Sequence, residues 1–153
     1  MFIFAFGSRS GVSPIHVSAV LSALNRSPGG PARALWSGDA PGADSFALQW
    51  ARSKGVKCRC WNADWPRFGR SAGVRRSAAL VKAIPYDPTY PGVICVCFAG
   101  CVAPVRSKWR YFEQVEEFLS AGSMHTFRFC RYARHFVTVE WACGSRWSFG
   151  GGE

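Results

Sequence analysis

Apolar residues along this chain occur in two patterns, short continuous runs and stretches with helical spacing. The continuous runs are typical of buried strands, which we expect at residues 2–6, 33–37, 56–61 and 92–98. Apolar residues that recur every three or four positions predict helices at residues 14–25, 42–54, 70–83 and 106–121. After Gly122 the pattern changes, and two strand-like runs follow at residues 124–131 and 134–142.

Strands that alternate with helices predict a mostly parallel sheet covered by helices on both faces. We therefore expect an α/β protein of the Rossmann-like, doubly wound class, with the two C-terminal runs forming a β-hairpin-like extension. The length of 153 residues suits one compact domain. We assign residues 1–144 to this domain and expect residues 145–153 to form a flexible tail.

A glycine-rich turn lies between the second predicted strand and the helix that follows it. It reads SGDAPGAD at residues 37–44. Gly38 and Gly42 allow a tight turn and a close approach of the backbone to a ligand, and the helix start offers N–H groups that favour a phosphate. Asp44 falls in the first helical turn, where a carboxylate stabilises the helix end or binds a ribose hydroxyl. Taken alone, the motif is more typical of an ordinary strand-to-helix turn.

Two further segments add polar groups at the expected carboxyl edge of the sheet. The first predicted strand is followed by Gly7, Ser8 and Arg9, a glycine turn with a hydroxyl and a guanidinium. A later segment, residues 62–77, reads NADWPRFGRSAGVRRS. Ligands of such sheets bind beside the carboxyl ends of the strands, near the point where the strand order reverses. We therefore expect these segments to meet at one edge.

Taken in this order, the three segments resemble the SLOG superfamily, and within it the small single-domain proteins of the YspA-like branch. That family reads GSR after its first strand, then G-x-A-x-G-A-D, then A-D-W, a glycine and A-G-P-x-R-N. The resemblance covers roughly residues 2–100. It implies a nucleotide-binding pocket formed by Gly7, Ser8, Arg9, Ser37, Gly38, Asp39, Gly42, Ala43, Asp44, Trp65, Gly73, Arg76, Ser77 and Gly100.

The chain departs from this family pattern at two places. The family's Arg-Asn pair is Arg76-Ser77 here, and its proline is Val74. Enzymatic relatives of the Lonely Guy type carry a P-G-G-x-G-T run with a nearby glutamate after the fourth strand, whereas residues 98–104 here read FAGCVAP. This difference argues against phosphoribohydrolase chemistry. We expect no catalytic residue, and Glu113 is a weak candidate for the acid of such an enzyme.

The charge balance favours anionic ligands. The chain carries 19 Lys and Arg against 9 Asp and Glu, a net charge of +10. Residues 52–82, which include the whole third segment, contain nine basic residues and a single acidic one, Asp64. A basic edge beside phosphate-binding turns raises the local concentration of anions such as nucleotides, cyclic oligonucleotides and nucleic acids. A solvated basic face is the alternative for the basic residues between positions 52 and 59.

Residues 127–136 interleave aromatic residues with arginines and read FRFCRYARHF. Aromatic side chains stack on bases and arginines pair with phosphates, so this run is compatible with single-stranded nucleic acid. We favour an edge hairpin with Phe127 and Phe129 pointing inward and Arg128 pointing outward. The same surface could also serve a homo-oligomer, because exposed strand edges pair readily.

Cysteines and apolar segments indicate the cellular environment. The cysteine pairs 58/60 and 95/97 lack the C-x₂₋₄-C spacing of zinc sites, and we expect reduced thiols and no metal. No apolar run approaches the ~18–20 residues that span a bilayer, and no basic flank precedes the first apolar run. We expect a soluble, cytoplasmic protein without a membrane partner.

These observations predict a protein that binds a nucleotide, or an NAD-derived or cyclic nucleotide, at the glycine turns and acts as a sensor or sequestering protein. We expect no resident cofactor. Two alternatives remain open: a nucleoside 5'-monophosphate phosphoribohydrolase-like enzyme, and a protein that binds single-stranded DNA as DprA does. Arginines that converge on the glycine turns favour the small ligand, whereas a continuous basic track away from the pocket favours DNA.

Overall fold

The computed structural model describes residues 1–85, 92–103 and 111–150, without the side chains of residues 111–114. Six strands form one sheet: β1 (Phe2–Gly7), β2 (Ala34–Gly38), β3 (Lys57–Trp61), β4 (Val93–Phe98), β5 (Phe136–Glu140) and β6 (Arg146–Phe149). Their order across the sheet is β3-β2-β1-β4-β5-β6. Strands β1 to β5 are parallel to one another, and β6 is antiparallel to β5. The expected Rossmann-like α/β fold is therefore confirmed.

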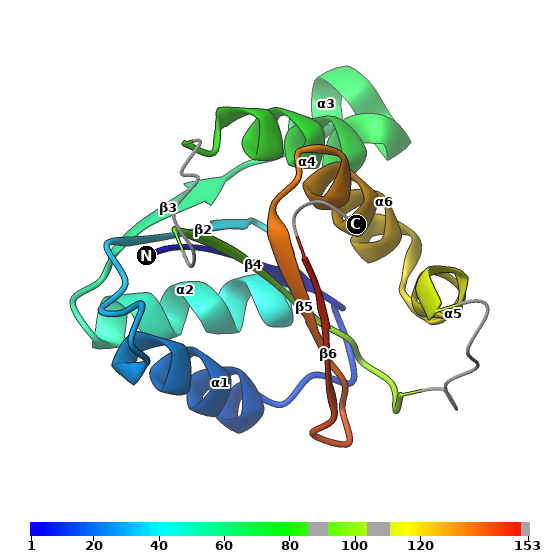
Figure 1. Cartoon of the computed structure of the whole chain (residues 1–153). Helices are drawn as coiled ribbons and strands as arrows, with labels where there is room; N and C mark the ends of the chain where they lie inside the picture. The colour runs from blue at the N-terminus through cyan, green and yellow to red at the C-terminus, as the bar shows by residue number, and fades with distance from the viewer. Residues whose placement is uncertain (86–91, 104–110, 151–153) are drawn as a thin grey trace.

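Helices cover both faces of the sheet (Figure 1). Helices α1 and α2 lie against one face, and α4 and α6 lie against the other. The helices and one 3₁₀ turn are α1 (Pro14–Arg26), α2 (Ala43–Ser53), α3 (Trp65–Phe68), η1 (Gly69–Ser71), α4 (Ala72–Ala83), α5 (Tyr111–Phe118) and α6 (Ala121–Tyr132). No helix in the described part of the chain is long and apolar enough to cross a membrane.

Strand β1 divides the hydrophobic core into two halves, because successive side chains of a strand point to opposite faces. Ile3 and Ala5 are buried with the residues of α1 and α2. Phe4 and Phe6 are buried on the opposite face, where their rings stack with centroids 5.1 Å apart. All four side chains at β1 positions 3–6 are apolar and buried, two on each face of the sheet. This explains why the strand is a continuous hydrophobic run.

The chain between residues 121 and 132 corrects one sequence-based expectation. We expected a strand at 124–131, but these residues belong to helix α6. The buried residues of the helix follow helical spacing: Ser123, Thr126, Phe127 and Cys130. The alternation of Phe127, Arg128 and Phe129 also fits a strand, and only the packing of α6 against α4 and the sheet decides between the two periods. The hairpin expected for this aromatic and basic run is therefore wrong.

The chain after residue 144 corrects a second expectation. Residues 146–149 of the expected flexible tail form strand β6, which pairs with β5 in the register Val139↔Trp147. Trp147 and Phe149 are buried in the core half that contains α6. The C-terminal antiparallel extension exists, but it consists of β5 and β6. The strand expected at 134–142 corresponds to β5.

Some expected features lie partly or wholly outside the described residues. The helix expected at 106–121 is described from residue 111 onward, as α5, and its first part lies outside. The proline-rich segment after α4 is described only up to residue 85. Short helix α3 was not expected. It begins after Asp64, whose side chain accepts a hydrogen bond from the N–H of Arg67 at 3.2 Å.

The burial of Phe127 provides a test of the α6 packing. Its ring is fully buried and lies edge-on to Phe149, with centroids 5.4 Å apart. We expect Phe127→Ala to lower the free energy of unfolding by ~3–5 kcal/mol, because the cavity it leaves cannot collapse fully. Tyr132→Ala, at a 90 % exposed position of the same helix, is the control and should change it by less than about 0.5 kcal/mol. Equal effects in chemical denaturation would contradict this packing.

Candidate ligand-binding site

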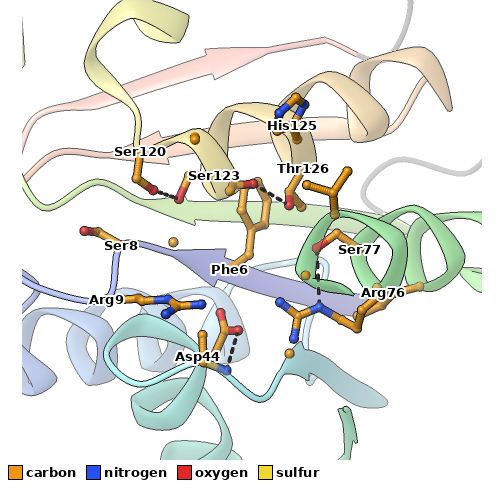
Figure 2. A pocket seen from close by; sticks show the side chains of 18 of the residues that line it. Phe6, Ser8, Arg9, Asp44, Arg76, Ser77, Ser120, Ser123, His125 and Thr126 are labelled. Atoms are coloured by element: carbon orange, nitrogen blue, oxygen red, sulfur yellow. Dashed lines mark hydrogen bonds between the residues drawn. The ribbon is translucent and has the colours of Figure 1, made fainter. Parts of the chain in front are cut away.

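A cavity of about 520 Å³ opens at the carboxyl ends of β1 and β2, between α4 and α6. Phe4, Phe6 and Leu80 form its apolar base. Figure 2 shows Arg9, Asp44 and Arg76 on one side of the cavity and residues of α6 on the other, with Phe6 between them. Polar groups from four separate segments thus surround one apolar base.

The turn after β1 is held by backbone hydrogen bonds on two sides. The N–H of Ser8 donates to the carbonyl of Phe98 at 2.9 Å, and the N–H of Ala43 donates to the carbonyl of Ser8 at 3.1 Å. Gly42 has φ +82°, and a Cβ there would lie 2.6 Å from the carbonyl oxygen of Arg9. A side chain at position 42 is excluded by both conditions. The N–H of Ala43, the first in α2, is hydrogen-bonded to the Ser8 carbonyl.

Arg76 reaches from α4 across the cavity to the turn after β2. Its Nη1 donates to Asp39 Oδ1 at 2.6 Å and to the carbonyl of Trp61 at 3.2 Å. The guanidinium passes directly over Gly38, where any Cβ would overlap it. Gly38 is therefore required for this arrangement because of the side chain that covers it. Its φ lies outside the left-handed region.

Asp44 is a buried carboxyl at the start of α2, and 4 % of it is exposed. Its Oδ2 accepts a hydrogen bond from the N–H of Ala40 at 3.3 Å. Burial raises the pKa of Asp44 from 3.8 to about 6, although the nearby charge of Arg76 and the hydrogen bond from Ala40 act in the opposite direction. This carboxyl lines the cavity, so it offers either a hydrogen-bond donor or an acceptor near neutral pH.

Trp65 and Arg9 lie at the opening of the cavity. Trp65 is 44 % exposed and is the first residue of α3. The guanidinium carbon of Arg9 lies 5.8 Å from the centroid of the Trp65 ring. An exposed tryptophan beside an arginine provides a flat apolar surface and a positive charge at one place. Arg70, from η1, also lines this part of the cavity.

The N-terminal turn of α6 lines the side of the cavity opposite Arg9 (Figure 2). The Ser120 hydroxyl donates to Ser123 Oγ at 2.9 Å, and the Thr126 hydroxyl donates to the carbonyl of Gly122 at 2.9 Å. His125 also lines the cavity. Sequence reasoning missed this side because it assigned residues 124–131 to a strand. The sequence does contain a signal for a helix start here, because Ser120 precedes apolar residues with helical spacing.

The structure places the expected site residues in two groups. Nine of them line the cavity: Gly7, Ser8, Arg9, Gly38, Asp44, Trp65, Gly73, Arg76 and Ser77. The others do not line the cavity but contact the segments that form it: Ser37, Asp39, Gly42, Ala43 and Gly100.

The supporting residues act through close backbone packing and hydrogen bonds. The Ser37 hydroxyl donates to the carbonyl of Ala5 at 2.7 Å, which ties β2 to β1. A Cβ on Gly100 would lie 2.8 Å from Ser8 Oγ, so the chain after β4 packs directly against the turn after β1. The side chain of Glu113, the weak catalytic candidate, lies outside the described residues. Within the described ranges, no group of three or more His, Cys, Asp or Glu residues is arranged to hold a metal ion.

Fold and cavity together define a Rossmann-like α/β protein whose candidate ligand site lies at the carboxyl edge of a mostly parallel sheet. No protein-family model, curated protein or solved structure matches the chain. The likeness to the SLOG superfamily therefore depends on the motifs alone.

The raised pKa of Asp44 predicts a pH dependence of stability. The folded protein binds this proton more tightly than the unfolded chain, so the stabilisation from protonated Asp44 is complete below about pH 4 and is lost as the pH rises through about 6. Relative to Asp44→Asn, the native protein should lose about 2 kcal/mol of unfolding free energy between about pH 4 and pH 7. Chemical denaturation of both proteins across this range measures the difference. Parallel curves would contradict the prediction.

Proposed function

We propose that this protein binds a nucleotide, or an NAD-derived or cyclic nucleotide, in the cavity at the carboxyl edge, as a sensor or sequestering protein. The observation that carries the proposal is the convergence of three sequence motifs on one cavity. Residues from the turn after β1, the turn after β2 and the start of α4 line it together. Ligands of doubly wound sheets bind at this edge, where the strand order reverses between β1 and β4.

The chemistry of the lining suits the separate parts of a nucleotide. Phe6 and Leu80 at the base and Trp65 at the opening offer apolar surface to a base. Arg9 offers a positive charge for a phosphate beside the glycine turn. The Asp44 carboxyl can donate to or accept from a ribose hydroxyl, since its pKa is about 6.

The ion pair between Arg76 and Asp39 bears on how a phosphate would bind. Asp39 already places a carboxylate oxygen on the guanidinium, and the Arg76 side chain is only 12 % exposed. A phosphate bound to Arg76 would compete with Asp39 or share the guanidinium with it. Arg9 is exposed and stacks near Trp65, so we assign it the main phosphate contact and Arg76 a supporting one.

The layout of charge favours a small ligand over DNA. Arg9, Arg70 and Arg76 converge on the cavity. By contrast, Arg67 and Arg75 lie over the ring of Phe68, with guanidinium carbons 4.9 and 4.5 Å from its centroid. Single-stranded DNA remains the second candidate, because this basic and aromatic surface on α3 and α4 adjoins the opening.

A thermal-shift panel tests the proposal directly. The compounds are AMP, ATP, NAD, ADP-ribose, cyclic ADP-ribose, cyclic dinucleotides and a short single-stranded DNA. A ligand at about 100 times its Kd adds ~2.7 kcal/mol of stability and should raise the Tm by roughly 5–10 °C. A shift with one nucleotide and none with DNA supports the proposal. A salt-sensitive shift with DNA alone overturns it in favour of the DNA-binding alternative.

The compound that gives the largest shift then tests the role of Arg9. We expect Arg9→Ala to weaken its binding by ~1.5–3 kcal/mol, the range for a hydrogen bond to a charged group. Arg26→Ala removes the same charge from the last turn of α1 and is the matched control, with unchanged affinity expected. Arg76→Ala is less informative because it also breaks the bonds to Asp39 and Trp61. Calorimetric titration gives the affinities, and equal Kd values for native protein and Arg9→Ala would remove Arg9 from the site.

A further inference from the structure

A second cavity, of about 400 Å³, lies on the other side of the turn between β1 and α1. The first residues of α1 and the turn between β5 and β6 line it, together with the end of β4. Val12, Ile15 and Ala19 give it an apolar side, and His16 and Cys143 are its titratable groups. None of these residues lines the first cavity.

Cys143 differs from the other described cysteines in its surroundings. It is exposed, and its Sγ lies 3.3 Å from the hydroxyl oxygen of Ser145. Hydrogen bonds with the backbone of Ala103 and with the side chain and backbone of Ser145 lower the pKa of the Cys143 thiol to about 7. Burial instead raises the pKa of the nearby Cys101 thiol, whose Sγ lies 3.3 Å from the carbonyl oxygen of Phe118. Of these two thiols, only Cys143 is poised to react as a thiolate.

His16 lines the same cavity and lies near a buried carboxylate. Its Nε2 lies 3.9 Å from Glu140 Oε2, and the Glu140 side chain is 2 % exposed. Arg146 also pairs with Glu140, so the carboxylate is fixed from two sides. The imidazole ring meets the edge of Phe98, with centroids 6.2 Å apart. An imidazole, a thiol and an apolar surface therefore surround one space.

We propose that this second cavity binds a low-molecular-weight disulfide and that Cys143 reacts with it, so that the protein becomes S-thiolated at this residue. The Cys143 thiolate attacks one sulfur of the bound disulfide. A new S–S bond forms to Cys143, the S–S bond of the reagent breaks, and the departing thiolate takes up a proton. This proposal is independent of the proposed function of the first cavity.

The cavity favours a disulfide over a smaller oxidant. A peroxide would need only access to the sulfur, whereas about 400 Å³ of space accommodates an organic molecule. Val12, Ile15 and Ala19 can contact its aliphatic part, and the His16 ring is placed to hydrogen-bond its polar part. Cys143 therefore lies at a cavity that can hold the group that becomes attached to its sulfur.

The first experiment uses oxidised glutathione, with intact-mass and peptide-mapping mass spectrometry as the readout. We expect one glutathionyl adduct, on Cys143, and no adduct in Cys143→Ser. Cys101→Ser is the matched control, because it removes a neighbouring thiol and should keep the adduct. An adduct distributed over several cysteines, or one that persists in Cys143→Ser, would overturn the proposal.

The second experiment separates binding in the cavity from simple exposure of the thiol. Ala19 is exposed on α1, so Ala19→Leu should fill part of the cavity while the fold is kept. We expect this variant to react several-fold more slowly with oxidised glutathione but at an unchanged rate with iodoacetamide. The native rate with oxidised glutathione should also saturate with its concentration. Equal slowing with both reagents, or a rate that rises linearly without saturation, would show that no disulfide binds there.

Discussion

The candidate site depends on the close packing of the turn after β1 between two other segments. The backbone of Ser8 donates to Phe98 and accepts from Ala43, so one residue joins the ends of β1 and β4 to the start of α2. This approach leaves no room for side chains at Gly42 and Gly100. Backbone N–H and C=O groups that are packed together need hydrogen-bond partners, and here the backbone groups of these segments bond to one another. The residues that line the first cavity just after β1 and at the start of α2 lie beside this contact.

Charge inside the first cavity is balanced by a small set of groups. Arg76 pairs with Asp39, while Asp44 is buried nearby with its pKa raised to about 6. A second ionised carboxylate close to Asp39 is costly in a buried place, and protonation of Asp44 removes that cost. The network therefore couples the protonation of Asp44 to the state of Arg76. An anion that binds Arg76 would change both the Asp39 contact and the proton affinity of Asp44.

The turn between β1 and α1 separates two cavities of different character. Ser8, Arg9 and Ser10 line the first cavity, and Gly11 and Val12 line the second. The first offers positive charge over an apolar base, which suits a phosphorylated ligand. The second is lined by an exposed thiol and a histidine. Both open at the carboxyl edge of the sheet, where strands end and loops supply the side chains.

The sequence alone determined the parallel α/β core and the three motifs that meet at its edge. Continuous apolar runs and helical spacing are local signals, so β1 to β4, α1, α2 and α4 were predictable. Residues 121–132 were not, because the pattern of Phe127, Arg128 and Phe129 fits both a strand and a helix, and β6 lies in the segment expected to be a flexible tail. Only the packing of α6 against α4, and of β6 against β5, decided their structure and placed Ser123, His125 and Thr126 at the cavity. Nor could spacing predict that Asp39 would hold Arg76 or that Ala103 would stabilise the Cys143 thiolate, since each contact joins residues distant in the chain.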